Sequence, residues 1–203
     1  MEAIPSDAQV DRDSVRVARL IAHARVGVAS LLDLVPDPET TLEQDTLAQT
    51  PARVVKAFLE MTSGYQADIE GLFARKFRVD YDELVVVRGI GFSSLCEHHL
   101  LPFSGEATVA YLPNGQVIGL SKLPSLVHAY ARRLQLQERM TEQIAKAIEL
   151  YAKPRGVAVV LKARHSCLSC RGQRERGAEM ITSAMLGQCR EDQNLRSELL
   201  ALL

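Results

Sequence analysis

The segment from Ser94 to Pro102, SLCEHHLLP, places a thiol, a carboxylate and two imidazoles in consecutive positions. Cys96 and His99 are separated by two residues, a spacing that lets both side chains converge on one metal ion from a tight turn. A third ligand must come from elsewhere, and Cys167, after a dense β-branched segment, is the best candidate. Two thiolates and an imidazole favour zinc over harder cations, and a site with three protein ligands leaves a fourth position for water.

A second cysteine near Cys167 leaves an alternative open. Cys167-Leu168-Ser169-Cys170 is itself a C-x-x-C motif. With Cys96 and His99, both of its cysteines would form a closed structural zinc site of the Cys₃His type. Such a site has no position for a reacting water, and the sequence alone does not decide between the two arrangements.

Two further histidines adjoin the candidate ligands, His98 beside His99 and His165 two residues before Cys167. Because residues two apart share a face of a strand, His165 and Cys167 are expected to point to the same side. An imidazole that titrates near neutrality is suited to general acid or base catalysis. A structural zinc site needs neither His98 nor His165, so together they favour a catalytic site.

The N-terminal part of the chain is expected to be helical. Apolar residues recur at helical spacing over 16–35, and two prolines directly after this stretch stop the helix. A second helix is predicted to begin at Thr50-Pro51, with the threonine as N-cap, and to run to Gly64. We therefore assign residues 1–80 to an N-terminal helical arm.

Residues 81–203 are expected to form one continuous catalytic domain. Strands predicted at 83–95 and 105–112 flank the CEHH motif, which therefore lies in the loop between them, and Gly89 and Gly91 permit a bulge in the first strand. The later predicted elements are helices at 121–134 and 138–151, strands at 157–163 and 179–186, and a short polar helix. This order predicts an α+β fold with an antiparallel sheet and two helices packed on it.

The composition of the chain limits the kinds of partner that it can bind. The 203 residues carry a formal net charge of −1, which argues against binding to nucleic acid through overall charge. No apolar run approaches membrane-spanning length. The N-terminus lacks the features of a secretory signal, so we expect a cytoplasmic protein with reduced cysteines. Any anionic ligand must then be met by a local cluster of Lys and Arg.

In combination, these motifs resemble GTP cyclohydrolase I, the enzyme family that opens the guanine ring of GTP on the way to pterins. The resemblance covers most of the chain from about Thr50 onward, in the family's order, and several ordered motifs are far more specific than any one. The segments that carry it are Cys96 to His99, Val117 to Lys122, Gln135 to Arg139, His165 to Cys167 with Arg171-Gly172, Thr50 to Arg53, and Thr182 to Ala184.

The resemblance implies the catalytic roles. Cys96, His99 and Cys167 correspond to zinc ligands, and water activated by the metal would attack C8 of the purine. His98 and His165 correspond to acid/base histidines that assist ring opening and the loss of formate.

The resemblance also implies the contacts with the nucleotide. Gln137 and Glu138 match a guanine-recognition pair, since a carboxylate can accept from the guanine N–H groups. Ser121, assigned to the catalytic group, matches a residue near the ribose and triphosphate. Lys122, Arg171 and Arg53 are the matching substrate-binding cations, with Arg53 expected from a neighbouring subunit.

The implied product is 7,8-dihydroneopterin triphosphate, for tetrahydrofolate, pterin or specialised deazapurine biosynthesis. The implied fold is the T-fold, or tunnelling fold, whose strands join across subunits into a barrel. The implied assembly is a toroidal homodecamer with sites at the subunit interfaces.

Ser125 departs from the family pattern, because this position commonly carries an arginine that helps to bind the triphosphate. Loss of such a charge-assisted contact costs on the order of 1.5–3 kcal/mol. Two alternatives therefore stay open: a related cyclohydrolase with altered nucleotide preference or an arrested ring-opened product, and a non-catalytic T-fold binder of purines or pterins with a structural zinc.

Overall fold

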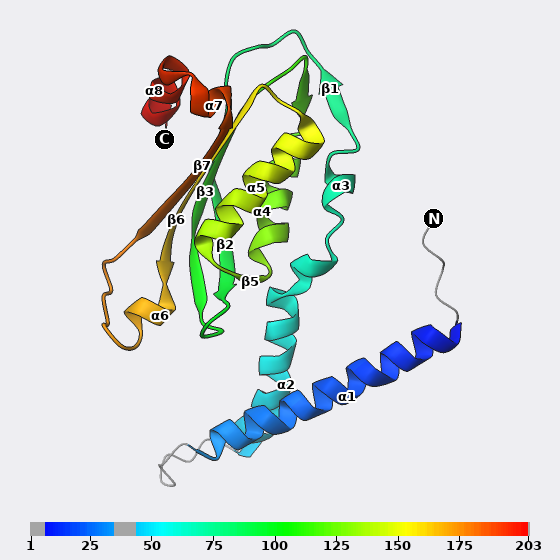
Figure 1. Ribbon diagram of the computed structural model, residues 1–203. Coiled ribbons are helices and arrows are strands. Elements are labelled where there is room, and N and C mark those ends of the chain that lie inside the picture. Colours follow the sequence, from blue (N-terminus) through cyan, green and yellow to red (C-terminus); the bar gives the residue numbers. More distant parts are fainter. Residues whose placement is uncertain (1–6, 35–43, 203) are drawn as a thin grey trace. The chain divides into compact units, whose positions relative to one another are not determined.

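The computed structural model describes residues 7–34 and 44–202. The chain divides into two compact units, Met1–Glu60 and Met61–Leu203. The first unit contains α1 (Asp7–Leu32) and most of α2 (Gln44–Met61), which confirms the two predicted N-terminal helices (Figure 1). The second unit contains every strand of the described chain.

The predicted start of the second helix is wrong. α2 begins at Gln44, so Pro51 lies inside the helix and Thr50 is not its N-cap. Proline removes one backbone hydrogen bond from a helix, and here that loss does not prevent the residues ahead of it from being helical. The predicted end of the first helix at Val35 and the prolines after it lie outside the described residues.

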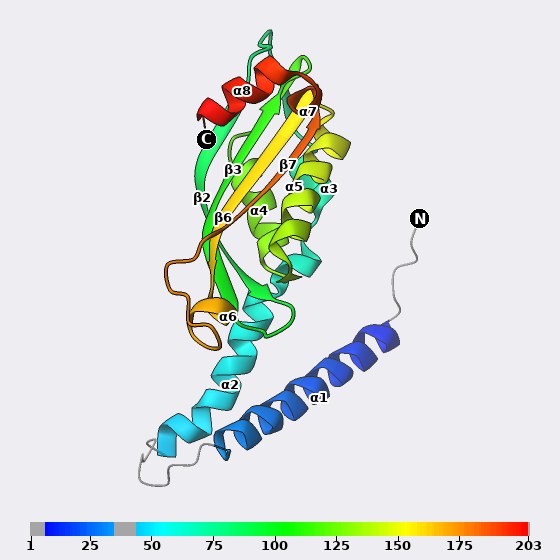
Figure 2. The same cartoon turned by 60° about the vertical axis from the view of Figure 1, so that its left-hand side comes forward.

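The second unit is built on a five-stranded sheet in the order β5-β2-β3-β6-β7. Figure 2 shows the four long strands β2, β3, β6 and β7. Its four long strands pair antiparallel, as predicted, and β5 adds a short parallel pairing at the end of β2. The strands are β2 (Val85–Cys96), β3 (Pro102–Leu112), β5 (Leu134–Gln135), β6 (Gly156–His165) and β7 (Met180–Gly187). A separate pair joins β1 (Lys76–Arg78) and β4 (Gln116–Ile118).

β2 contains the bulge that its glycines predicted. Its register with β3 shifts between Val87 and Ile90, and Gly89 has a φ of 70°. Glycine takes this conformation without steric cost, because it has no Cβ. After the bulge, Ile90 and Phe92 are buried in the core.

Two helices, α4 (Lys122–Ala131) and α5 (Gln137–Ala152), pack on one face of the sheet (Figure 1). Leu126, Met140 and Ile144 from these helices are fully buried in the main core, together with residues of the central strands. This is the predicted α+β arrangement. A smaller core, which includes Ala158 and Cys189, joins the sheet to the C-terminal helices α7 (Gln188–Glu191) and α8 (Gln193–Leu202).

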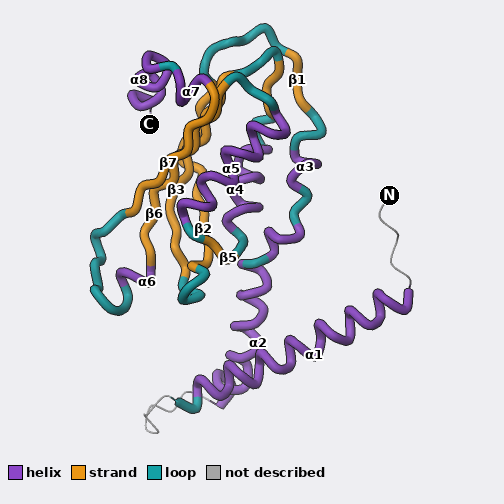
Figure 3. Tube along the Cα trace, in the orientation of Figure 1, coloured by secondary structure: helices purple, strands orange, loops and turns teal. Residues whose placement is uncertain are grey.

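Short helical elements lie between the longer helices and strands (Figure 3). They are the 3₁₀ turn η1 (Ser63–Gln66) and the single helical turns α3 (Ile69–Leu72) and α6 (Ser166–Ser169). Within the described ranges, no helix is both long and apolar enough to cross a membrane.

A candidate metal and catalytic site at one end of the sheet

The predicted metal ligands and His165 lie at one end of the sheet. Cys96, the last residue of β2, lies opposite Gln135 of β5. Phe103, next to the start of β3, pairs with His165, the last residue of β6. α6, which contains Cys167, follows His165 directly. Strand register thus brings together the loop after Cys96 and the segment around Cys167, which are far apart in the sequence.

The side chains of Cys96, His99 and Cys167 form a group that could hold a metal ion, because their ligand atoms all lie within 4.8 Å of one another. Sγ of Cys96 lies 3.7 Å from Nδ1 of His99. Tetrahedral zinc, with bonds of about 2.3 Å to sulfur and about 2.0 Å to nitrogen, holds its ligands roughly 3.5 Å apart, so this spacing suits it.

Among the residues that the structure describes, Cys170 is not part of this group. It is exposed at the C-terminal end of α6, where its N–H donates to the carbonyl of Ser166. The geometry therefore favours three protein ligands and an open position over a closed site of the Cys₃His type.

A tight turn makes the two ligands of the CEHH motif converge. The N–H of Leu100 donates to the carbonyl of Cys96 at 2.9 Å, and the N–H of Cys96 donates to the carbonyl of Leu101 at 2.9 Å. Leu100 has a φ of 53°, in the left-handed region that costs a residue with a Cβ roughly 1–2 kcal/mol. The loop is thus closed by its own backbone at the position of the ligands.

The expectation that His165 and Cys167 share a strand face is wrong. β6 ends at His165, and Cys167 lies in the helical turn α6. The partner strand β3 begins at Pro102, which has no N–H to donate, so the ladder stops at this point. Cys167 reaches the other two ligands because the chain turns.

The surroundings of the Cys167 thiol favour its protonated form. Burial raises the pKa of the Cys167 thiol, the nearby Cys96 raises it further, and Arg171 acts in the opposite direction. A bound cation reverses this balance, because a coordinated thiol is deprotonated. The donor set therefore fits a metal ion with a preference for sulfur and nitrogen.

His98 lies beside the group and is open to solvent. Its Nδ1 is 3.9 Å from Sγ of Cys96, and its side chain is 62% exposed. The His98 and His99 rings meet edge to face, with their centroids 6.2 Å apart. His98 is thus accessible to a ligand that approaches the candidate metal position.

Sequence reasoning gave Glu97 no role, but the structure joins it to α5. Its carboxylate forms an ion pair with Arg139, and its N–H donates to the carbonyl of Gln135 at 3.1 Å. Arg139 also donates through Nε to Oε1 of Gln135 at 3.1 Å. Glu97 and Arg139 stand in two of the quoted motifs, but no sequence signal paired them.

His165 is held on two sides. Its ring stacks on Phe103, with centroids 4.5 Å apart and an interplanar angle of 3°, and its Nε2 lies 2.9 Å from Oε1 of Gln137. Burial lowers the pKa of His165, and the charge of Glu138 acts in the opposite direction. The neutral imidazole is therefore favoured relative to an exposed histidine.

The other predicted residues differ in where the structure places them. Ser121 and Lys122 lie at the start of α4, and no contact joins them to the group in the described part of the chain. Arg171 acts on the pKa of Cys167, as above, and is exposed. Arg53 lies in α2 of the first unit, where it donates to Gln49.

Fold and site together define an α+β protein with a candidate metal centre of two cysteines and a histidine. The family model for GTP cyclohydrolase I matches residues 27–203. The chain belongs to the GTP cyclohydrolase I family and is an enzyme of that type.

Individual relatives carry the same name. The chain is 49% identical over 174 residues to GTP cyclohydrolase 1 of Alkalilimnicola ehrlichii, which covers 85% of this chain and 92% of the relative. It is 44% identical over 195 residues to GTP cyclohydrolase 1 of Rhodopirellula baltica. That match covers 96% of this chain and 83% of the relative. Among solved structures, the apo form of an archaeosine synthase QueF-Like is similar with a TM-score of 0.43 and 23% identity, over 51% of this chain and 93% of that one.

Proposed function

We propose that this enzyme hydrolyses GTP at C8 of the guanine ring, releases formate and forms 7,8-dihydroneopterin triphosphate, with zinc held by Cys96, His99 and Cys167. The observation that carries the proposal is the convergence of these three ligand atoms within 4.8 Å in a chain of this family. When bound, zinc would supply the Lewis acid that activates water for attack on the ring. The product would serve tetrahydrofolate, pterin or deazapurine biosynthesis.

The chain's own side chains divide the remaining work. His98, exposed beside Cys96, exchanges protons with the ring that opens. His165, favoured in its neutral form by burial, accepts a proton. The exposed carboxylate of Glu138, in the first turn of α5, accepts from the guanine N–H groups. Because the charge of Glu138 acts on the pKa of His165, a guanine ring bound by Glu138 would lie next to His165.

The triphosphate end of the site is proposed to need a second copy of the chain. Ser121 and Lys122 precede or begin α4, whereas the other end of α4 leads into β5 beside Cys96. A helix of 10 residues spans about 15 Å, so these two residues and the metal group of the same chain lie far apart. We assign Ser121, Lys122 and Arg53 to contacts with a nucleotide bound mainly by the neighbouring subunit, alongside Arg171.

The edge of the sheet supports a homo-oligomer. β7 is the last strand in the sheet order, so one side of its backbone has no strand partner within the described chain. An unpaired strand edge is a template for pairing with another chain. The homodecamer implied by the family resemblance stays part of this proposal, and sedimentation of a monomer at working concentration would contradict it.

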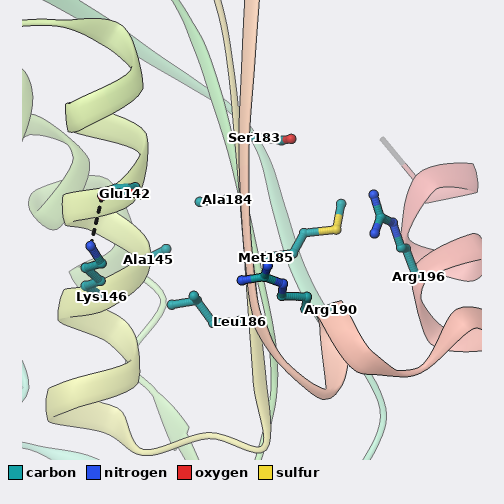
Figure 4. A pocket seen from close by; sticks show the side chains of 9 residues that line it. All are labelled: Glu142, Ala145, Lys146, Ser183, Ala184, Met185, Leu186, Arg190 and Arg196. Carbon is teal, nitrogen blue, oxygen red and sulfur yellow. Dashed lines mark hydrogen bonds and ion pairs between the residues drawn. The ribbon is translucent and has the colours of Figure 1, made fainter.

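A pocket also runs along β7, between α5 and the C-terminal helices (Figure 4). In it, Lys146 of α5 is paired with Glu142, whereas Arg190 and Arg196 come from α7 and α8. The lining residues are Glu142, Ala145, Lys146, Ser183, Ala184, Met185, Leu186, Arg190 and Arg196. We assign this pocket to the surface between copies, because it follows the open strand edge.

The direct test is to incubate the zinc-loaded protein with GTP and to measure formate and, after oxidation, neopterin fluorescence. Both products are expected. Formate without neopterin would replace the full reaction by an arrested ring-opened product, and turnover of another purine nucleotide alone would indicate altered preference. Neither product with any purine nucleotide, at full zinc occupancy, would leave only the non-catalytic binder.

A further inference from the structure

A buried chain of hydrogen bonds connects α5 and β7 to His165, and the donor and acceptor of each bond can be assigned. Oγ1 of Thr141 lies 2.7 Å from the backbone carbonyl of Gln137, which only accepts, so Thr141 donates to it. Oγ1 of Thr141 is also 2.7 Å from Oγ1 of Thr182. Since the Thr141 proton is already used, Thr182 is the donor of that bond and remains free to accept another.

The side-chain amide of Gln137 can take only one orientation. Its Nε2 lies 3.1 Å from the carbonyl of Leu161, 3.0 Å from the carbonyl of Met180 and 3.1 Å from Oγ1 of Thr182. Turning the amide over would place its oxygen against two carbonyl oxygens, with no donor for either. The nitrogen therefore faces these groups, and Oε1 faces His165.

The orientation of the amide determines the tautomer of His165. Oε1 of Gln137 lies 2.9 Å from Nε2 of His165. An amide oxygen only accepts, so Nε2 carries the proton and donates. In the neutral ring, Nδ1 is then unprotonated, and no described residue forms a hydrogen bond with it. The stacked ring of Phe103 holds the plane of the imidazole.

We propose that Gln137 is a positioning residue for His165, which fixes the tautomer that leaves Nδ1 for the substrate, and that its amide does not bind guanine. This inference rests on the proposed function, and it separates Gln137 from Glu138, which the family resemblance treats as a pair. Gln137 is only 1% exposed, whereas Glu138 is exposed. To reach a base, the amide would have to give up several buried hydrogen bonds, each of which is costly to leave unmade.

The first test observes the ring proton directly. In zinc-loaded protein with ¹⁵N-labelled histidine, at a pH well above the ordinary imidazole pKa, we expect an Nε2-bound proton of His165 that exchanges slowly with water. A spectrum of His165→Asn assigns the signal. In Gln137→Met, which has a similar length but no amide, the proton is expected to exchange with water and its signal to disappear.

A matched control separates positioning from a general loss of packing. Gln135 is a second buried glutamine, 2% exposed, whose amide bonds to the carbonyl of Tyr130, to Gln143 and to Arg139 and forms no hydrogen bond with His165. Gln135→Met should lower the free energy of unfolding by a similar amount and keep the His165 signal. A wild-type ring protonated on Nδ1, or a Gln137→Met protein that keeps the protected proton, would overturn the proposal. The wild-type measurement decides the tautomer even if Gln137→Met does not fold.

The second test is kinetic. General acid–base groups contribute about 10²- to 10⁴-fold, so a misoriented His165 should lower kcat for formate release in Gln137→Met by about 10- to 100-fold. The KM for GTP should stay within about twofold of wild type, as expected for a group that does not touch the base. A raised KM with unchanged kcat would make Gln137 a base contact and refute the inference. If the wild-type protein releases no formate, the proposed function fails, but the spectrum still tests the role of Gln137.

Discussion

At the scale of single residues, the candidate site distinguishes cysteines that look equivalent in the sequence. Cys167 and Cys170 form a C-x-x-C motif, yet only Cys167 joins Cys96 and His99 within 4.8 Å. One turn of helix accounts for the difference, since α6 directs Cys167 to the group and leaves Cys170 exposed at its end. A short helical turn is hard to predict from four residues, and for this reason the sequence left the ligand set open.

The first prediction concerns zinc content. Cys167→Ser should reduce bound zinc to a small fraction of one ion per chain, because the hydroxyl is a poor ligand for a metal that prefers thiolate. Cys170→Ser should leave the zinc content unchanged. Elemental analysis of the two purified variants, with circular dichroism to confirm that each is folded, checks this. Zinc lost from Cys170→Ser and kept by Cys167→Ser would reverse the assignment.

At the scale of elements, the metal loop is tied to the helix that bears Glu138. The ion pair of Glu97 with Arg139 and the bond from the Glu97 N–H to Gln135 join the β2–β3 loop to the start of α5. These contacts hold the loop that presents Cys96 and His99. Residues that orient metal ligands in this way contribute to affinity without touching the metal.

The second prediction follows from this link. Arg139→Ala should weaken zinc binding by about 10-fold, because the loop that carries two ligands loses its anchor. Lys146→Ala is the matched control: it removes the ion pair with Glu142 on the same helix, away from the metal group, and should leave zinc affinity unchanged. Competition with a chromogenic chelator measures both. Equal affinities in Arg139→Ala and wild type would show that the ion pair does not position the loop.

The third prediction concerns the second core, where α7 meets the sheet. Burial raises the pKa of the Cys189 thiol to about 11, from an ordinary value of 9.0. Because the pKa of this thiol is higher in the folded state than in the unfolded state, its protonated form stabilises the fold. This contribution is fully present below pH 9 and is lost as pH rises toward 11. The amount lost is on the order of 2–3 kcal/mol. The unfolding free energy of wild type relative to Cys189→Ala, measured from about pH 8 upward, should fall accordingly, whereas a constant difference would contradict it.

The elements themselves could largely be predicted. The strands around the CEHH motif, the bulge at Gly89 and both packed helices follow from alternation, glycine placement and helical periodicity. Long-range pairing could not be predicted in the same way. The parallel contact of β5 with β2 and the bond between Gln137 and His165 depend on strand register. Register is set by the packing of the whole sheet rather than by a local pattern.

At the scale of the whole molecule, the metal group and two of the proposed triphosphate contacts, Ser121 and Lys122, lie at opposite ends of α4. The length of α4 separates Lys122 from Cys96 of the same chain, and β7 leaves an open strand edge. The family resemblance placed sites at subunit interfaces without giving a reason. Within the described residues, the length of α4 between Lys122 and β5 agrees with the proposal that Lys122 serves the metal group of another copy.

The fourth prediction tests this shared site by complementation. Lys122→Ala and Cys167→Ser should each lower formate release strongly when expressed alone, because every oligomer then lacks either the cation or a metal ligand. Co-expression at equal levels should restore roughly one quarter of the wild-type sites, since a site that takes Cys167 from one copy and Lys122 from another is intact in that fraction of random pairs. Affinity tags of two kinds select the mixed oligomers, and a mixture of the separately purified variants, assayed before subunits exchange, is the control. Mixed oligomers that stay inactive while binding zinc would place Lys122 and Cys167 of a working site in the same chain.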